Sequence, residues 1–337
     1  MDIHSKACYK SKNRNHSDLH QHYPIPFGRL LCDPSTHYIR YRNDTMKNVA
    51  VFEEVEEYKE GNDLLMMTAA TSNHHVVAQM CLLTMVRFCP YSNILFGDMG
   101  LTEDERNTMF NIAWLIYRIH RMLNSSAIFY YRLLDLNHFP LWVQNTKDFA
   151  GVYSLKLYVG LDAAMQWKAN IGIIDAGSNL IRAPLNELQY VKKEGIYSPW
   201  SIGYVKNWVH PLSKEFLIHY GIVDSIDANG RNCCGGHIFF DYRNSTVREK
   251  VLIPMQLCAY THACLVPRGS NRRNHRQDQA IWSVLLNNLH LKYSSNLQYS
   301  HHSAKFWTDK YINASSIKYY LNKTLEGVYH DASARII

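Results

Sequence analysis

Four short apolar segments, separated by stretches with helical signals, constrain the fold of this chain more than any other feature. Each is continuously apolar rather than alternating, as expected for strands that are covered on both faces of a parallel sheet. Strands that alternate with helices along a chain indicate βα crossovers. We therefore expect an α/β fold with a mostly parallel sheet flanked by helices. The segments are Leu64–Ala70, Asn93–Asp98, Ser126–Tyr131 and Ile171–Asp175.

Helix signals fill the gaps between these segments. Thr71–His75 is typical of a turn and cap before a helix. Thr102, followed three residues later by Glu105, forms a capping box. A third helix is expected from Tyr153. We expect these helices to end near Phe88, Leu123 and Gln166.

The second half of the chain mixes helices and strands. We expect helices over Glu215–Tyr220, Val251–Ala259, Gln277–Leu289 and Ser315–Leu325, and strands over Gly236–Asp241 and Ala263–Pro267. Residues 1–60 are polar, basic and broken by prolines, which is typical of a stem or irregular segment. We expect one domain over 61–337, with a nucleotide-type half (61–180), an acceptor half (181–300) and a tail (301–337).

The charge of the chain is modest, with a net +7, and is concentrated in two places. Residues 1–42 hold seven Lys and Arg against three Asp, and a basic knot spans Pro267–Arg276. For the first we expect a solvated segment; the second fits either a solvated loop or a phosphate-binding loop. Aromatic residues do not interleave with these basic ones, so we expect no nucleic-acid partner.

Sequons and cysteines indicate a secretory compartment. Six Asn-X-Ser/Thr sequons occur, at Asn15, Asn43, Asn124, Asn244, Asn313 and Asn322, where chance gives roughly two or three. Of eight cysteines none forms a CxxC pair. Cys258 and Cys264 are close enough in sequence to close a small disulfide loop, and the other pairings stay open. We expect the Golgi or secretory lumen, with an upstream anchor missing from this chain, or alternatively a secreted protein.

Two aspartates carry the strongest chemical signals. Asp175 ends the fourth apolar segment and precedes Gly177, a position where a carboxylate can hold a divalent metal or a sugar hydroxyl. Asp278 falls in the first turn of a predicted helix, where it can accept a proton from an incoming hydroxyl. For each, a helix or turn cap is the alternative explanation.

Histidines give weaker signals. His210 follows Trp208-Val209, an aromatic context suited to stacking on a sugar, and His275 lies in the basic knot, where it can bind metal or phosphate. Asn73 and His74 follow the first strand at a nucleotide-contacting position, although Asn73 can equally cap the next helix. No G-x-G-x-x-G, Walker A, H-E-x-x-H or G-x-S-x-G motif occurs, which disfavours dehydrogenases, P-loop enzymes, zincins and α/β-hydrolases.

Taken in order, several motifs resemble a group of animal proteins related to the GT-A (nucleotide-diphospho-sugar transferase) glycosyltransferases. This group is expanded in nematodes and other invertebrates and is partly catalogued as a domain of unknown function. The resemblance covers roughly residues 64–290. It is carried by Thr68–His74, Asp98–Thr102, Phe139-Pro140, Tyr153 with Lys156, Ile174–Ser178, Cys258-Ala259 with Cys264–Pro267, and His275–Gln279.

The resemblance implies a GT-A-like fold, a nucleotide-sugar donor (a UDP-sugar favoured), a glycan or glycoprotein acceptor, Mn²⁺ or another divalent cation, and a type II Golgi membrane context. By this resemblance Asp175 takes the place of the acid that contacts metal and donor, and Asp278 is the candidate base. Apart from the resemblance, His210 is a second candidate metal ligand. The other donor-binding candidates are Asn73, His74, Lys156, Ser178, Arg272, Arg273 and His275.

Two functions follow from this sequence. The first is a glycosyltransferase that moves a sugar from a nucleotide-sugar donor to a hydroxyl acceptor, and the resemblance implies a hexosyltransferase. The second is a catalytically inactive GT-A-fold protein that binds carbohydrate or a partner. Asp175 has no second acid two residues later, because position 177 is glycine, and this favours the second.

Overall fold

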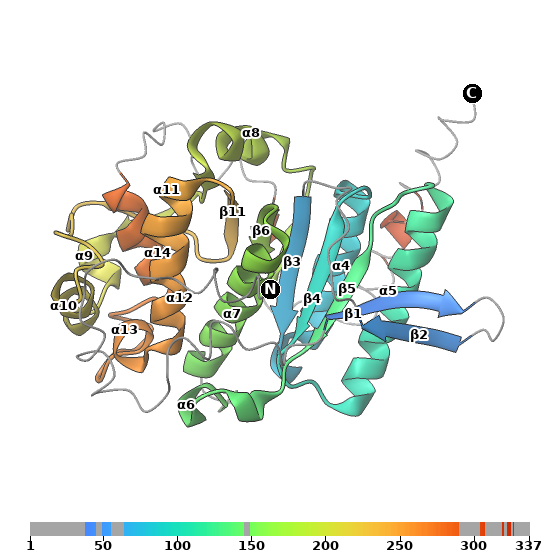
Figure 1. Cartoon of the computed structure of the whole chain (residues 1–337), viewed down its shortest axis with the longest axis horizontal. Helices are drawn as coiled ribbons and strands as arrows, with labels where there is room; N and C mark the ends of the chain where they lie inside the picture. The colour runs from blue at the N-terminus through green and yellow to red at the C-terminus, as the bar shows by residue number, and fades with distance from the viewer. Residues whose placement is uncertain are drawn as a thin grey trace, which may run out of the picture. The chain divides into compact units, whose positions relative to one another are not determined.

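The computed structural model describes residues 38–44, 49–54, 64–144, 149–289 and 304–306, together with 319, 322–324 and 326. An eight-stranded sheet in the order β2-β1-β5-β4-β3-β6-β11-β8 forms its centre (Figure 1). The four strands β5, β4, β3 and β6 are parallel to one another, and β1 and β11 flank them in antiparallel pairing. The strands are β1 (Tyr38–Asp44), β2 (Val49–Glu54), β3 (Leu64–Ala70), β4 (Asn93–Asp98), β5 (Phe129–Leu133), β6 (Asn170–Ile174), β8 (Ile196–Tyr197) and β11 (His237–Asp241). The expected α/β fold with a mostly parallel central sheet is confirmed.

Helices cover both faces of this sheet. Met66 and Phe96 join the core formed with α4 (His75–Phe88) and α5 (Glu103–Met122). The next residues along the strands point to the opposite face, where α7 (Phe149–Trp167) packs. Gly160 of α7 lies so close to the sheet that a Cβ there would be 2.5 Å from Cδ1 of Ile173. The helix is therefore held tightly against β6.

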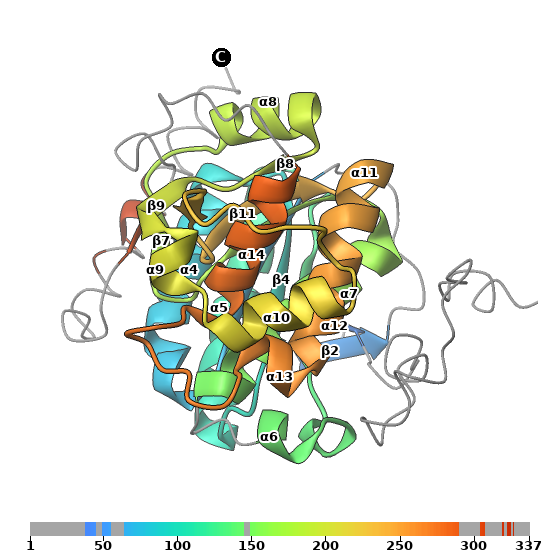
Figure 2. The ribbon, with the colours of Figure 1, turned by 90° about the vertical axis from the view of Figure 1, so that its left-hand side faces the viewer.

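The second half of the chain packs on the outer side of α7. Helix α12 (Ile253–Tyr260) contacts α7 directly, and Ser154 of α7 donates a hydrogen bond to the carbonyl of Ala259. Figure 2 shows α14 (Gln277–Asn288) and α10 (Pro211–His219) in front of the sheet from this side. Smaller elements complete the description: α6 (Leu141–Gln144), α8 (Leu185–Glu194), α9 (Val205–Trp208), α11 (Ser245–Val247), a π-helical turn (Arg248–Leu252), α13 (His262–Leu265), β7 (Ser178–Leu180), β9 (Trp200–Tyr204), β10 (Arg231–Cys233), β12 (Ala304–Phe306) and two 3₁₀ turns, Ser72–His74 and Leu136–His138.

Local capping explains where several elements begin. The predicted capping box is present, because Thr102 Oγ1 accepts from the Glu105 N–H at 3.4 Å and Glu105 Oε2 accepts from the Thr102 N–H at 2.8 Å. Helix α10 begins earlier than expected, since Pro211 suits a first helical position and His210 caps it. The third strand begins at Phe129 instead of Ser126, because the Ser125 hydroxyl accepts from the Ala127 N–H and holds a turn there.

Two predictions about local structure are wrong. The strand expected over 263–267 is the short helix α13, because a disulfide joins Cys258 to Cys264 and folds the chain back after α12. Residues 38–44 and 49–54, expected within an irregular stem, form the hairpin β1–β2 at the edge of the sheet. The stem's residues 1–37 and most of the tail lie outside the described residues.

The six cysteines in the described part of the chain are all buried, and two of them form a disulfide. The disulfide that the sequence allowed between Cys258 and Cys264 is present. Cys81, Cys89, Cys233 and Cys234 are buried free thiols, and burial raises the pKa of each. No helix among the described residues is both long and apolar enough to cross a membrane.

Candidate functional site

The order of the parallel strands creates a crevice at the end of β6. From β3 the chain runs outward through β4 and β5 and then returns to place β6 on the other side of β3. In open α/β sheets, ligands bind beyond the carboxyl ends of the strands at such a switch point. Asp175 follows β6 directly, and its N–H donates to the carbonyl of Gly236 at 2.9 Å.

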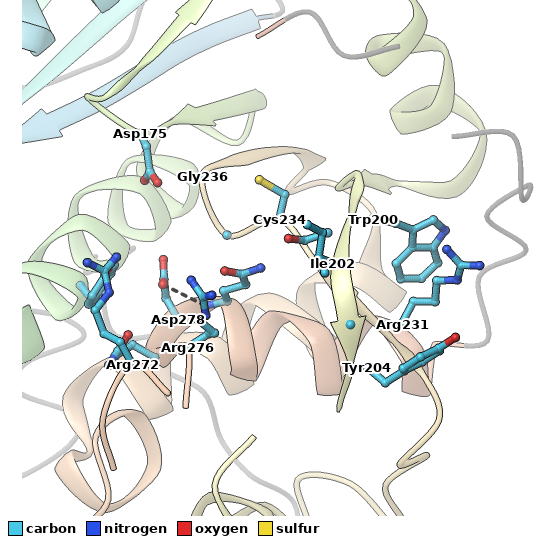
Figure 3. A pocket seen from close by; sticks show the side chains of 16 residues that line it. Asp175, Trp200, Ile202, Tyr204, Arg231, Cys234, Gly236, Arg272, Arg276 and Asp278 are labelled. Carbon is cyan, nitrogen blue, oxygen red and sulfur yellow. Dashed lines mark hydrogen bonds between the residues drawn. The ribbon is translucent and has the colours of Figure 1, made fainter. Parts of the chain in front are cut away.

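A cavity of about 700 Å³ opens beside Asp175, a volume typical of small-molecule sites. Figure 3 shows Asp175 and Asp278 toward one end and the side chains of the β9–β10 ribbon toward the other. Its wall combines acids, arginines and exposed aromatic or apolar groups. These include Asp175, Asp278, Arg231, Arg272, Arg276, Trp200, Ile202 and Tyr204.

One lysine joins the two aspartates behind this wall. Lys156 Nζ of α7 lies 2.8 Å from Oδ1 of Asp175 and forms a second ion pair with Oδ2 of Asp278. It also donates to the carbonyl of Gly235 at 3.3 Å. Lys156 and Asp278 are buried, with 6% and 2% of their surface exposed, whereas Asp175 is half-buried. The three residues come from α7, the end of β6 and the first turn of α14.

Burial and mutual attraction shift the protonation of this group. Burial alone would lower the pKa of Lys156, but the carboxylates of Asp175 and Asp278 outweigh it and raise that pKa above its usual range. Lys156 is therefore an ammonium. Burial raises the pKa of Asp278, and the neighbouring Lys156 opposes this rise. A carboxyl whose pKa moves toward neutrality is suited to accepting a proton.

The backbone around Asp278 is unusual. Gln277, the residue before it, has a φ of +42°, a region that a residue with a long side chain rarely adopts and that clusters at functional sites. Gly235 allows the loop after β10 to approach this helix start, since a Cβ there would lie 2.9 Å from Cβ and 3.0 Å from Cα of Gln279. The backbone that carries Asp278 is thus constrained on both sides of this residue.

Two arginines lie at the same end of the pocket. Arg272 donates to the Tyr153 hydroxyl at 3.3 Å. The guanidinium of Arg276 stacks over the Trp208 ring at 4.3 Å from its centroid, and Trp208 Nε1 donates to the Ile202 carbonyl. Trp208 thus holds Arg276 beside β9.

His275, predicted to bind metal or phosphate, is instead engaged inside the protein. Its Nε2 lies 2.9 Å from the Leu265 carbonyl, and its Nδ1 accepts from the His210 N–H at 3.2 Å. Both ring nitrogens are therefore used inside the protein, and burial lowers the pKa of His275 to about 4. A neutral, fully buried ring cannot neutralise a phosphate; it holds the basic loop in place.

Other predicted residues lie outside the pocket wall. Asn73 and His74 occupy a 3₁₀ turn after β3. Ser178 is buried at the start of β7, and its N–H donates to the Asp175 carbonyl at 2.8 Å. Arg273 is exposed. Their donor-binding roles stay predictions, whereas Asp175, Asp278 and Arg272 line the cavity and Lys156 joins the two acids.

The residues present do not suit the divalent cation implied by the resemblance. The position between Asp175 and Asp278 is taken by the Lys156 ammonium, which would repel a cation. His210, the second candidate ligand, is not part of the wall, and its Nδ1 accepts from the Leu212 N–H as a helix cap. Within the described ranges no three His, Cys, Asp or Glu side chains gather as a metal site would require.

The β9–β10 ribbon contributes residues that sequence reasoning missed. Ile202 is 87% exposed and Tyr204 is also exposed, although both are large. Arg231 from β10 lies beside them (Figure 3). The sequence signal that could have indicated this part of the pocket was the concentration of aromatic residues in the segment 197–208.

No known family model and no curated protein matches the sequence. Among solved structures, the chain is similar to the bifunctional glycosyltransferase WbbM in its apo form, with 11% identity, 70% of this chain and 40% of that chain covered, and a TM-score of 0.43. It is also similar to core-mannan synthase A from Aspergillus fumigatus in a Mn/GDP form, with 8% identity, coverage of 69% and 71%, and a TM-score of 0.42. A third is the galactosyltransferase LgtC with donor and acceptor sugar analogues, with 13% identity, coverage of 79% and 95%, and a TM-score of 0.41. This chain spans less than half of WbbM. Because the three TM-scores are low, no residue role is carried over from these structures.

Proposed function

We propose that the cavity beside Asp175 binds a nucleotide-sugar and that the protein transfers the sugar to a hydroxyl acceptor. The observation that carries this proposal is that one cavity contains both groups that can bind a diphosphate and a group that can accept a proton. Arginines suited to a diphosphate line the same wall as Asp278, a buried carboxylate with a raised pKa. A UDP-sugar is our favoured donor, and a hexose our favoured group to be transferred.

The proposed reaction needs a base and a stabilised leaving group. The acceptor oxygen forms a bond to the anomeric carbon, the bond from that carbon to the diphosphate oxygen breaks, and the acceptor proton passes to the Asp278 carboxylate. The departing nucleoside diphosphate takes the bonding electrons, and Arg272 and Arg276 stabilise its charge. No step requires a further reactant.

The exposed side of β9 supports a carbohydrate acceptor. Trp200 and Tyr204 lie on the far part of the pocket wall from Asp278 (Figure 3). Aromatic rings present an apolar body and a polar edge, which suits the alternating faces of a sugar ring. We place the reaction in the Golgi or secretory lumen on a glycan or glycoprotein, supported by six sequons and the Cys258–Cys264 disulfide.

A binding protein without catalysis is the second candidate. One observation favours it: Asp278 is only 2% exposed and already pairs with Lys156. A base in that state must exchange part of its ion pair for the acceptor proton. In the binding-only case the same pocket holds the nucleotide-sugar or glycan without turnover.

Activity against a donor panel separates these candidates. The full chain, expressed in a secretory host, is incubated with UDP- and GDP-sugars and a mixture of oligosaccharide acceptors, and released nucleoside diphosphate is measured. We expect turnover of one donor, lost in Asp278→Asn and kept in Asp224→Asn, an equivalent change at an exposed acid outside the pocket. Donor binding by calorimetry without turnover favours the binding protein. If the protein neither binds nor turns over any donor, the proposal is overturned.

A further inference from the structure

We propose that the Lys156 ammonium serves as the built-in cation of this site, so that the pocket binds a diphosphate without a divalent metal. We further propose that removing this ammonium creates a divalent-cation site between Asp175 and Asp278. The choice of a nucleotide as ligand rests on the proposed function, whereas the cation argument rests on three side chains alone.

The first step is the geometry of the three charged groups. Lys156 Nζ is 2.8 Å from Asp175 and pairs directly with Asp278, so both carboxylates converge on one nitrogen. Convergence of two carboxylate oxygens on a single point is what a divalent cation requires of its ligands. Here an ammonium occupies that point, anchored by a third contact to the Gly235 carbonyl.

Burial and tight packing hold the Lys156 ammonium between the two acids. The Lys156 side chain is only 7% exposed and extends from a helix that packs closely against the sheet at Gly160. Withdrawing the ammonium would leave two carboxylates close together and partly buried, and breaking a buried ion pair in this way is strongly unfavourable. A metal therefore cannot displace Lys156 cheaply in the folded protein.

The second step is the charge of the pocket. Asp175 and Asp278 contribute two negative charges, and Lys156 with the three lining arginines contributes four positive charges, so the group carries +2 when fully ionised. A nucleoside diphosphate carries about two to three negative charges near neutral pH. Without Lys156 the group carries only +1, and the two acids would face the diphosphate unneutralised. The lysine thus supplies the neutralisation that a metal would otherwise bring.

Direct binding tests this proposal on the full chain. UDP and inorganic pyrophosphate are titrated into the wild-type protein by calorimetry, once with EDTA and once with Mn²⁺. We expect the two dissociation constants for each ligand to agree within about twofold. Lys156→Met, which keeps length and removes charge, is expected to bind UDP at least about tenfold more weakly in EDTA and to recover part of this loss when Mn²⁺ is added.

A metal titration without nucleotide tests the second part. Free Mn²⁺ is followed by electron paramagnetic resonance as protein is added. Lys156→Met is expected to bind one additional Mn²⁺ compared with the wild type and with Lys193→Met, a matched change at an exposed lysine. Adding Asp175→Asn to Lys156→Met should abolish that extra site. No extra Mn²⁺ in a folded Lys156→Met variant overturns the created site.

The wild-type arm keeps the proposal testable if the variant does not fold. A wild-type protein that binds UDP with Mn²⁺ and loses it in EDTA contradicts the built-in cation directly. If the wild type binds neither UDP nor pyrophosphate under either condition, the proposed function fails. In that case the Mn²⁺ titration of a folded Lys156→Met variant still tests whether the ammonium occupies the position of a divalent cation.

Discussion

Two buried histidines make the folded protein sensitive to mild acid. His120 is 3% exposed and His275 is fully buried, and burial lowers the pKa of each from 6.5 to about 4. In the unfolded chain both return to their ordinary value. Between pH 6.5 and pH 4 the unfolded state therefore binds more protons, and the free energy of unfolding falls as the pH falls.

The size of the effect follows from the two pKa values. Inside that window each histidine removes about 1.4 kcal/mol per pH unit. Lowering the pH from 7 to 5 therefore removes about 2 kcal/mol for each, or about 4 kcal/mol for the pair. Above pH 7 neither histidine contributes further, because both states are then neutral.

The substitution His120→Leu isolates one half of this loss. Its stability at pH 7 changes through packing and through the lost hydrogen bond to Ala127, but its decline between pH 7 and pH 5 is expected to be about 2 kcal/mol smaller than that of the wild type. Other titrating groups, including Asp278, are present in both proteins and cancel in this difference.

Urea unfolding at pH 7, 6 and 5, followed by tryptophan fluorescence, measures the difference. His219→Leu, at an exposed histidine of α10, is the matched control and should decline as the wild type does. If His120→Leu declines as steeply as the wild type, within about 0.5 kcal/mol, then His120 is protonated in the folded state and the reasoning from burial fails.

Three further predictions concern other parts of the domain. Replacing Cys258 and Cys264 by serine removes the disulfide that closes a short loop. The free energy of unfolding is expected to fall by about 2 kcal/mol, which lowers the Tm measured by calorimetry by about 3 °C. An unchanged Tm contradicts this prediction. Gly235→Ala places a Cβ against the Gln279 backbone. Overpacking of this kind is expected to lower the free energy of unfolding by about 1–3 kcal/mol and to weaken UDP binding. An unchanged affinity for UDP refutes the importance of the close approach between Gly235 and Gln279. Asn124 is exposed at a φ of +51°, and Asn124→Gln is expected to remove one glycan by mass spectrometry of protein from a secretory host; an unmodified wild-type Asn124 disproves it.

The parallel sheet was predictable because its signal is local and strong. Asn93–Asp98 is buried along its whole length, and Leu64–Ala70 is buried at every residue after Leu64. Strands covered on both faces are continuously apolar. The hairpin of β1 and β2 was missed because the apolar residues of β1 alternate with charged ones and the short apolar run of β2 ends in two glutamates. An edge strand tolerates such charges, so its pattern resembles that of a polar segment.

The site was predictable only where topology fixes it. Asp175 follows from its place after β6, and Asp278 from its place at a helix start. The inward use of His275 depends on its contacts with the His210 N–H, 65 residues away, and with the Leu265 carbonyl. These contacts leave no periodic signal in the sequence. The contribution of Tyr204 was hidden for a similar reason, since β9 is a short strand in a separate two-stranded ribbon.

The three charges of the site come from distant parts of the chain, and this ties ligand binding to the completeness of the fold. Lys156 and Asp175 are present once the first half has been made, but Asp278 arrives only with α14. A chain cut before α14 would still contain every strand of the central sheet and the Lys156–Asp175 pair, but the part of α7 that α14 covers would be exposed. Because contacts of such long sequence separation form slowly, the pocket should be among the last features to appear during folding. Ligand-dependent protection from proteolysis would then report on chains that have finished folding, and not on partly folded ones.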